Sequence, residues 1–114
     1  MVSWGDVIRD FESYLRLERA LSINSVKSYV SDLNKFASYC LENNGGNFLE
    51  DISVSKIEEY LVKYVEEGNS KRSQARLLSS LKAFDRFVRS SNYGKRADDV
   101  GIEGIATPKS SMFV

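Results

Sequence analysis

The chain has 114 residues, of which 42% are hydrophobic and 11% aromatic, so it is large and apolar enough to form one small folded domain. Sixteen basic and sixteen acidic residues give a net charge of zero, and the absence of histidine excludes His-ligated metal sites and Ser-His or Cys-His nucleophile pairs. The single cysteine, Cys40, excludes an internal disulfide and a CxxC metal site, and it is typical of a reducing compartment.

No apolar run approaches the ~20 residues that span a bilayer. The N-terminal sequence MVSWGDVIRD has no basic segment followed by a hydrophobic one, so it does not resemble a signal peptide. We therefore expect a cytoplasmic protein that has no membrane partner and needs no cofactor.

Two helices are predicted in the first half of the chain, from about residue 4 to 19 and from about residue 24 to 43, because apolar residues recur there at helical spacing. Ser3 is the expected N-cap of the first helix, and Ser22 or Asn24 that of the second. The sequence Asn-Gly-Gly at residues 44–46 ends the second helix. The expected core residues of these helices are Trp4, Ile8, Phe11, Leu15, Val26, Tyr29, Val30, Leu33, Phe36, Ala37, Cys40 and Leu41.

Two further helices are predicted from about residue 54 to 67 and from about residue 70 to 90. Ser55 and Glu58 have the spacing of a capping box at the start of the third helix, and Ser53 is a competing cap. Gly68 and Asn69 end that helix. The expected core residues here are Ile57, Tyr60, Leu61, Tyr64, Val65, Leu77, Leu78, Leu81, Phe84 and Val88.

No stretch alternates between apolar and polar residues for long enough to predict a sheet, so the predicted fold is all-α, a compact four-helix bundle. A longer loop at residues 44–53 is expected to be anchored by Phe48, Leu49 and Ile52. Helical periodicity fades after Asn92, so residues 1–92 are expected to form the folded domain and residues 93–114 a C-terminal linker.

Charge is segregated along the chain although its total is zero. Residues 46–69 carry six acidic and two basic side chains, a net charge of −4, whereas residues 70–96 carry eight basic and one acidic side chain, a net charge of +7. On the fourth helix, Ser79 and Ala83 fall within the basic arc opposite the apolar residues, where small side chains would let the backbone approach phosphates closely. Asp85 lies on the flank of that arc. An ordinary solvated face explains this pattern, a nucleic-acid partner would also explain it, and a protein-interaction module with separate acidic and basic faces is a further alternative.

Several residues that resemble catalytic groups are interpreted as structural. Tyr14, Tyr60 and Tyr64 have no accompanying base or oxyanion donors, so we assign them to packing, and Cys40 to a buried thiol. The acidic residues of the third helix lack ligand partners at metal spacing and are expected to form a solvated face: Glu58, Glu59, Glu66 and Glu67.

Two segments carry a family resemblance. The first comprises residues 11–15, FESYL, residues 21–33, LSINSVKSYVSDL, and Phe36. The second comprises residues 73–84, SQARLLSSLKAF. The first segment is similar to a pattern in the N-terminal core-binding domain of tyrosine recombinases, S-x-N-T-hydrophobic-x-x-Y-x-x-D-L-x-x-F. The second segment is similar to the fourth helix of the same domain. This family comprises the phage integrases and the Xer-type enzymes, and the resemblance covers about residues 5–109.

The resemblance implies a SAM-like helical domain that clamps one face of duplex DNA through its second and fourth helices. The nucleophilic tyrosine of the family belongs to a separate catalytic domain, so we expect this chain not to be an enzyme by itself and its linker to lead toward that domain. The parent protein is expected to be a tyrosine-type site-specific recombinase of a prokaryote or phage, associated with the nucleoid. The implied DNA-binding residues are Asn24, Ser25, Lys27, Ser28, Ser31, Lys35, Lys71, Arg72, Ser73, Gln74, Arg76, Lys82 and Arg86.

Double-stranded DNA and other recombinase subunits on that DNA are the implied partners. In the family, the subunits associate mainly through their catalytic domains, so we predict that this chain is monomeric in dilute solution without DNA. Light scattering at micromolar concentration measures this directly, and a stable dimer would contradict the prediction.

Overall fold

The computed structural model describes residues 4–44 and 53–90, and this part of the chain is helical, with no strand. Its helices are α1 (Trp4–Leu17), α2 (Ile23–Asn44), α3 (Val54–Glu66) and α4 (Lys71–Ser90). The predicted all-α, four-helix fold is confirmed. The expected cap Ser3, the loop anchored by Phe48, Leu49 and Ile52, the residues Gly45 and Gly46, and the linker at 93–114 lie outside the described residues.

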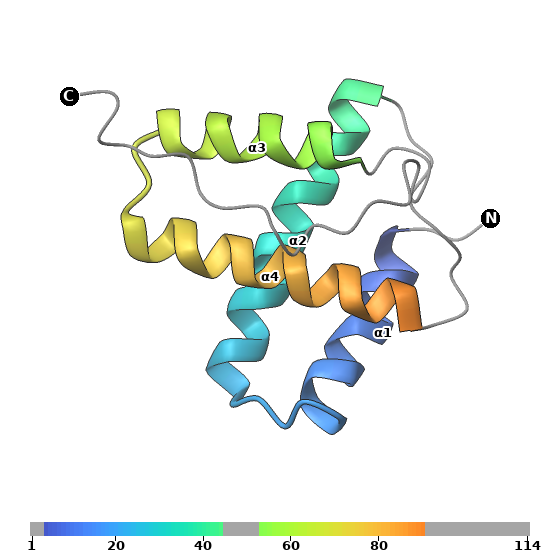
Figure 1. Ribbon diagram of the computed structural model, residues 1–114. Coiled ribbons are helices and arrows are strands. Elements are labelled where there is room, and N and C mark those ends of the chain that lie inside the picture. Colours follow the sequence, from blue (N-terminus) through green and yellow to red (C-terminus); the bar gives the residue numbers. More distant parts are fainter. Residues whose placement is uncertain (1–3, 45–52, 91–114) are drawn as a thin grey trace.

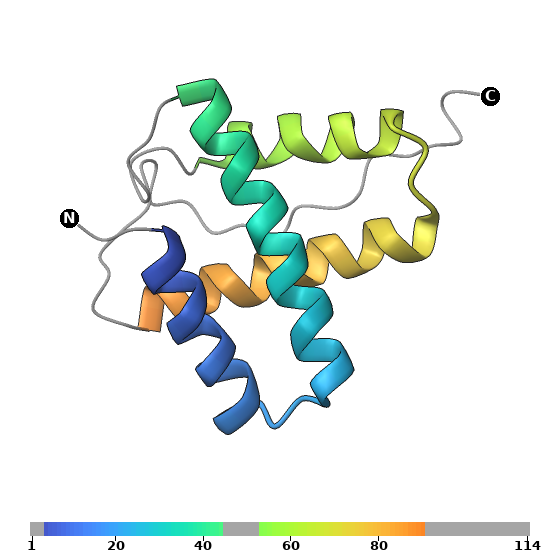
Figure 2. The ribbon, with the colours of Figure 1, turned by 180° about the vertical axis from the view of Figure 1, so that it is seen from behind.

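The helices form two crossed layers. In Figure 1, α3 and α4 run side by side, and α2 crosses behind both of them; Figure 2 shows the same crossing from the other side. α1 returns alongside the N-terminal half of α2 and also packs against α4. α4 therefore contacts each of the other three helices.

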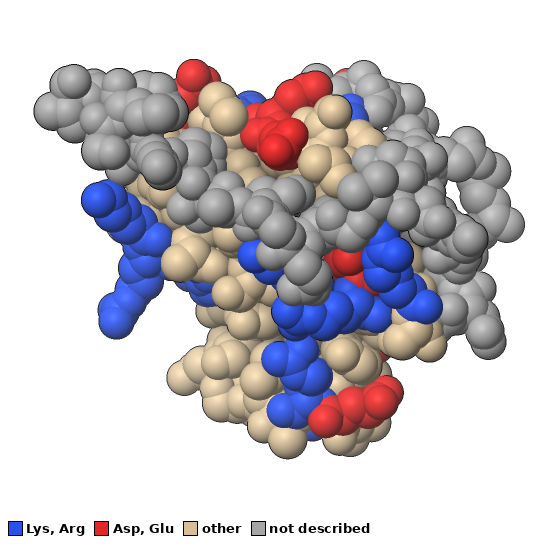
Figure 3. Space-filling model, in the orientation of Figure 1, with Lys and Arg blue, Asp and Glu red and all other residues tan. Residues whose placement is uncertain are grey.

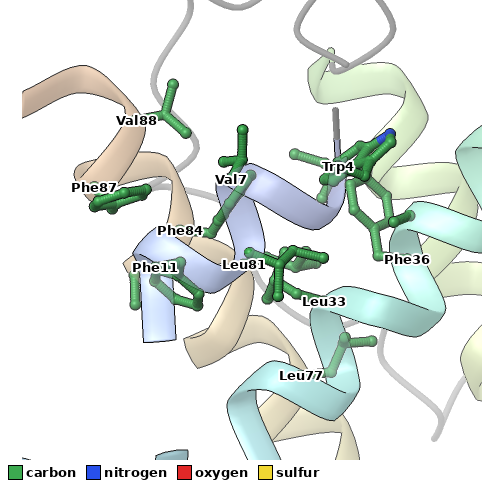
Figure 4. Packing of buried hydrophobic residues seen from close by; sticks show 14 of the residues in the cluster. Trp4, Val7, Phe11, Leu33, Phe36, Leu77, Leu81, Phe84, Phe87 and Val88 are labelled. Atoms are coloured by element: carbon green, nitrogen blue, oxygen red, sulfur yellow. The ribbon is translucent and has the colours of Figure 1, made fainter. Parts of the chain in front are cut away.

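Aromatic rings fill the junction between α1, α2 and α4 (Figure 4). The ring of Trp4 stacks on Phe84 at a centroid distance of 5.9 Å and meets Phe36 edge-on at 6.1 Å. Phe11 meets Phe84 edge-on at 5.2 Å and also contacts Phe87 at 5.6 Å. Such offset and edge-on ring pairs add favourable contact energy beyond simple burial.

Most of the predicted core residues are buried, and Phe87, which the sequence pattern did not select, is buried as well. Three further positions differ from the expectation. Leu41 was expected in the core and is 47% exposed, whereas Cys40 beside it is fully buried, so Leu41 lies outside the buried stripe of α2. Val7 is fully buried although the sequence pattern did not select it, and Ala83 is 2% exposed although it was expected on the open basic arc. Ala83 is buried because α1 packs against the C-terminal half of α4, where Phe11 and Tyr14 contact Phe87, and so widens the buried arc of that helix.

Each connection has an identifiable local cause. α1 ends in a turn in which Ala20 adopts a left-handed φ of 51° and the N–H of Leu21 donates to the carbonyl of Leu15. This turn stops α1 at Leu17, two residues before the predicted end. Ser22 caps α2, since its Oγ accepts the N–H of Ser25 at 3.2 Å.

The turn between α3 and α4 is the best anticipated of the connections. Gly68 has a φ of 88°, which glycine adopts at little cost, and the Asn69 side chain donates to the carbonyl of Tyr64 at 2.8 Å. Ser70 then caps α4 by accepting the N–H of Ser73 at 3.1 Å. The expected helix stop at Gly68-Asn69 is confirmed.

The capping box predicted from Ser55 and Glu58 is wrong. Ser53 is the N-cap of α3: its backbone is extended, and its Oγ accepts the N–H of Lys56 at 3.1 Å. Ser55 already lies inside the helix, where its side chain is exposed.

The cap assignment makes a prediction about stability. Ser53→Ala should lower the free energy of unfolding by about 1 kcal/mol because it leaves the first turn of α3 without its acceptor. The matched control Ser55→Ala should change it by less than ~0.5 kcal/mol. Urea unfolding followed by circular dichroism measures both variants, and equal losses would contradict the assignment.

Candidate nucleic-acid interface

Basic side chains gather over α4 in two places. Figure 3 shows one group at the N-terminal end of the helix and another over its C-terminal half. Lys71 and Arg72 are exposed at the N-terminal end. Further along, Arg86 is exposed and Lys82 is half-buried. The segregation of charge in the sequence therefore becomes a basic face of one helix.

Arg76 pairs with a carboxylate on another helix. Its Nε donates to Oδ2 of Asp32 at 3.0 Å, and its Nη2 donates to Oδ1 at 3.0 Å, so the pair is bidentate. Asp32 belongs to α2 and is 1% exposed, whereas the Arg76 side chain is 38% exposed. The hydrogen bonds that Arg76 donates to Asp32 raise the pKa of Arg76 above its ordinary value, so its guanidinium remains charged.

Ser80 completes this group from the next turn of α4. Its Oγ donates to Oδ2 of Asp32 at 2.9 Å, and Ser80 itself is fully buried. The carboxylate of Asp32 thus accepts three hydrogen bonds, all from α4, which offset the loss of its hydration. We call these three residues, Asp32, Arg76 and Ser80, the crossing network, because they join α2 to α4 where the two helices cross.

The sequence interpretation did not assign a role to Asp32 or Ser80. Asp32 appeared only as a position in the family pattern, and Ser80 was not singled out. A signal was available: Asp32 directly precedes the core residue Leu33, next to the apolar arc of its helix, where a carboxylate needs a hydrogen-bonding partner. That signal indicates a partner without identifying it.

Gln74 and Ser73 belong to the turn between α3 and α4. Gln74 is 5% exposed, and its Nε2 donates to the carbonyl of Asn69 at 3.0 Å. Ser73 is half-buried, and the Oγ of Ser70 donates to its Oγ at 3.2 Å. Both side chains therefore stabilise the start of α4 in this structure.

The candidate residues of α2 lie along its outward side. Lys27, Ser31 and Lys35 are exposed and line a shallow groove of about 410 Å³. The carboxylate-bearing residue Glu12 of α1 lies in the same lining. Asn24 is exposed, Ser28 is half-buried, and Ser25 accepts a hydrogen bond from the Ser22 hydroxyl at 3.1 Å.

The structure brings part of the predicted set together at the crossing network. Ser28 and Lys35 lie one turn before and one turn after Asp32 on the same side of α2, and Arg72 lies one turn before Arg76 on α4. Helical periodicity places Lys82 and Arg86 away from Asp32, on a different side of α4 from Arg76 and Ser80. The thirteen predicted residues therefore do not form one flat patch. Some lie near the crossing network, whereas Lys82 and Arg86 lie away from it on α4.

Asp85 is a second buried carboxylate. The sequence pattern had placed it on the flank of α4. It is 4% exposed, and Arg89 donates from its Nε to Oδ2 of Asp85 at 3.1 Å. This pair links residues one turn apart on the same helix, unlike the crossing network. Asp85 is thus a core-facing residue, since α1 and α3 both pack against α4.

The outward face of α3 is acidic, as predicted, with Glu58, Glu59, Glu66 and Glu67 exposed. Lys63 donates to Glu67 at 2.7 Å, and this hydrogen bond raises the pKa of Lys63. No group of potential metal ligands occurs among the described residues. These residues also contain no helix long and apolar enough to cross a membrane.

The tyrosines singled out in the sequence have packing roles. Tyr60 and Tyr64 are each 6% exposed, and Tyr14 packs against the core beside Phe11 and Phe87. Burial raises the pKa of Tyr60 far above its ordinary value, so its phenol stays neutral. Cys40 is fully buried, as predicted.

Comparisons with known proteins agree with the sequence resemblance. The family described as "Phage integrase, N-terminal SAM-like domain" matches residues 8–92. A tyrosine recombinase XerD of Listeria monocytogenes is 36% identical over 108 residues, which cover 95% of this chain and 35% of that protein. A tyrosine recombinase of Pseudothermotoga lettingae is 32% identical over 90% of this chain and 35% of its own length.

A more distant relative is a tyrosine recombinase XerC of Syntrophus aciditrophicus, 26% identical over 96% of this chain and 36% of its own length. The chain thus spans about a third of the length of the curated relatives that it matches. No solved structure gives a significant match.

The crossing network makes a prediction about stability. Arg76→Leu should lower the free energy of unfolding by roughly 2–4 kcal/mol, because it leaves a buried carboxylate with Ser80 as its remaining donor. The expected loss is below that of a fully buried ion pair because water partly screens the Arg76 guanidinium.

Arg72→Leu is the matched control, one turn earlier on the exposed side of α4, and should change the unfolding free energy by less than ~0.5 kcal/mol. Urea unfolding compares the two variants. A loss for Arg72→Leu as large as that for Arg76→Leu would show that the network contributes nothing specific.

Proposed function

The chain belongs to the phage integrase N-terminal SAM-like domain family, and from this premise we propose that it is the DNA-binding arm of a site-specific tyrosine recombinase. It binds duplex DNA through α2 and α4, around the crossing network and further along α4. Its relatives are tyrosine recombinases, an activity that requires a protein to hold DNA.

One observation carries the proposal: hydrogen-bond donors and basic side chains from two helices meet at one crossing. Lys35 and Ser28 of α2 and Arg72 of α4 lie within one turn of the crossing network. Phosphates are recognised by such mixed sets of lysine, arginine and small hydroxyl side chains. The acidic residues of α3 are on another helix, so they repel DNA that approaches from a different side.

We assign the contacts by chemistry and exposure. Exposed lysines and small hydroxyl or amide side chains bind phosphates, and Arg72 either binds a phosphate or reads a guanine edge in the major groove. Lys82 and Arg86 contact phosphates further along α4. We leave Gln74, Ser73 and Ser25 out of the contact set because their side chains are engaged within the turns that begin α4 and α2. The proposed phosphate-binding residues are Asn24, Lys27, Ser28, Ser31, Lys35, Lys71, Lys82 and Arg86.

We propose that the matched third of the relatives supplies DNA binding, and that strand cleavage and joining belong to the part of those proteins outside the match. The tyrosines Tyr14, Tyr60 and Tyr64 are packed among other rings, which supports this division. Within the chain, residues 1–92 form the DNA-binding unit and residues 93–114 the connection to a catalytic domain. Other recombinase subunits bound to the same DNA are the proposed protein partners.

The proposal predicts salt-dependent binding to duplex DNA. An arm that engages about three to five phosphates should show a slope of log K against log salt of roughly −3 to −4.5, with Kd near 10⁻⁴ to 10⁻⁶ M on random sequence. Arg72→Ala should flatten the slope by about one if Arg72 binds a phosphate. If it reads a base, the loss should be ~1–3 kcal/mol and confined to the cognate sequence.

Fluorescence anisotropy with a labelled duplex over a salt series measures these quantities. Arg9→Ala is the matched control, since Arg9 is an exposed arginine of α1 that pairs with Asp6 at 2.8 Å, and it should leave the slope unchanged. Lys56→Ala on α3 should behave in the same way. Equal losses in all three variants would show that overall charge, and not the proposed face, determines the binding.

A further inference from the structure

The crossing network contains a feature that its contribution to stability does not explain. A buried ion pair is often replaceable by well-packed apolar residues without loss of stability, so burying Asp32 is not the cheapest way to join α2 to α4. The network also involves an arginine whose side chain remains 38% exposed, at the surface where the N-terminal halves of the two helices meet. One end of the network is therefore in the core and the other reaches solvent.

The geometry of the guanidinium determines what that outer end offers. A guanidinium has five N–H donors in a rigid planar fork. Asp32 takes one edge, through Nε and Nη2, which leaves the N–H groups of Nη1 and the second N–H of Nη2. The described residues provide no further partner for these donors. The free edge is the one that binds a phosphate with two parallel hydrogen bonds.

We infer that Asp32 is a positioning residue for DNA binding: its buried carboxylate holds Arg76 at the crossing of α2 and α4 so that the free edge of the guanidinium receives a DNA phosphate. This inference rests on the proposed function. Ser80 supports the arrangement by fixing Oδ2 of Asp32 from the same helix as Arg76.

Two physical consequences favour this arrangement over a freely moving arginine. A free arginine loses about 2 kcal/mol of rotamer entropy when it is immobilised on a ligand, whereas Arg76 is already held before DNA arrives. The fixed position also gives Arg72, Ser28 and Lys35 a rigid neighbour, so that one phosphate site is set relative to both helices. Preorganisation of this kind increases affinity without new contacts.

Positioning and simple electrostatics predict opposite changes in DNA affinity when Asp32 loses its charge. Asp32→Asn removes a negative charge beside the proposed DNA-binding face, so a purely electrostatic effect would strengthen binding. Loss of positioning should instead weaken binding of the 114-residue chain to a labelled random-sequence duplex by about ten-fold, equivalent to one charge-assisted hydrogen bond. Anisotropy titrations at a temperature where circular dichroism shows the variant to be folded measure this change.

Asp85→Asn is the matched control, because Asp85 is also a buried carboxylate paired with an arginine but lies in the C-terminal half of α4. It should lose stability and keep the affinity of the wild-type chain within about two-fold, since its partner Arg89 is not among the proposed phosphate-binding residues. If Asp32→Asn binds as tightly as wild type, or more tightly, the inference is overturned while the proposed function stands. If the wild-type chain itself does not bind the duplex, the proposed function fails and the inference falls with it.

Arg76→Lys provides a second measurement should Asp32→Asn fail to fold. It keeps the positive charge, but an ammonium group lacks the two edges with which a guanidinium binds the Asp32 carboxylate and a phosphate at the same time. Positioning predicts a loss of affinity of about ten-fold, whereas charge alone predicts none. Wild-type affinity in Arg76→Lys would overturn the inference.

A spectroscopic readout separates positioning from a structural role. In the wild-type chain, the Nε–H proton of Arg76 should exchange slowly with water because it donates to Asp32, and duplex DNA should shift the resonances of the Nη groups. An Arg76 side-chain spectrum that does not change on saturation with duplex would contradict the inference, whatever the stability of the variants.

Discussion

The bidentate hydrogen bond between Arg76 and Asp32 is the interaction on which the relation of α2 to α4 depends. These residues are 44 positions apart in the sequence, and the carboxylate is buried to 1% exposure at the point where the two helices cross. Apolar contacts hold helices together but are non-directional, so they permit sliding and rotation that a bidentate pair does not. The crossing network thus fixes the relative orientation of α2 and α4, whereas aromatic rings and aliphatic side chains supply the contact energy of their interface.

α4 has two halves with different environments. Its C-terminal half is enclosed by α1, whose Trp4 and Phe11 contact Phe84, and this burial extends to Ala83 and Phe87. Its N-terminal half has α2 on one side and the turn from α3 on another, so that Lys71 and Arg72 remain exposed. A single helix therefore both builds the core and presents charge, because its neighbours cover the two halves to different extents.

Although the net charge of the chain is zero, its acidic and basic side chains are concentrated on different helices. Acidic side chains on α3 and basic side chains on α4 belong to adjacent helices of one layer (Figure 1), so the molecule has a strong separation of charge over a short distance. Such a charge distribution orients a polyanion as it approaches and disfavours the wrong face. Its effect is strongest at low salt, since exposed charges more than about 10 Å apart are screened at ordinary ionic strength.

The sequence by itself determined the number of helices, most of the core and the basic character of α4, because helical periodicity and turn residues such as Gly68 act over a few neighbouring positions. It also supported the family, through patterns in α2 and α4. Only the tertiary structure decided that Ala83 is buried, that Ser53 rather than Ser55 caps α3, and that Arg76 pairs with Asp32. Periodicity identifies the residues that share a face of a helix, but the partner across that face is set by how distant segments pack. The roles of Arg76, Asp32 and Ser80 therefore became visible once α2 and α4 were seen to cross.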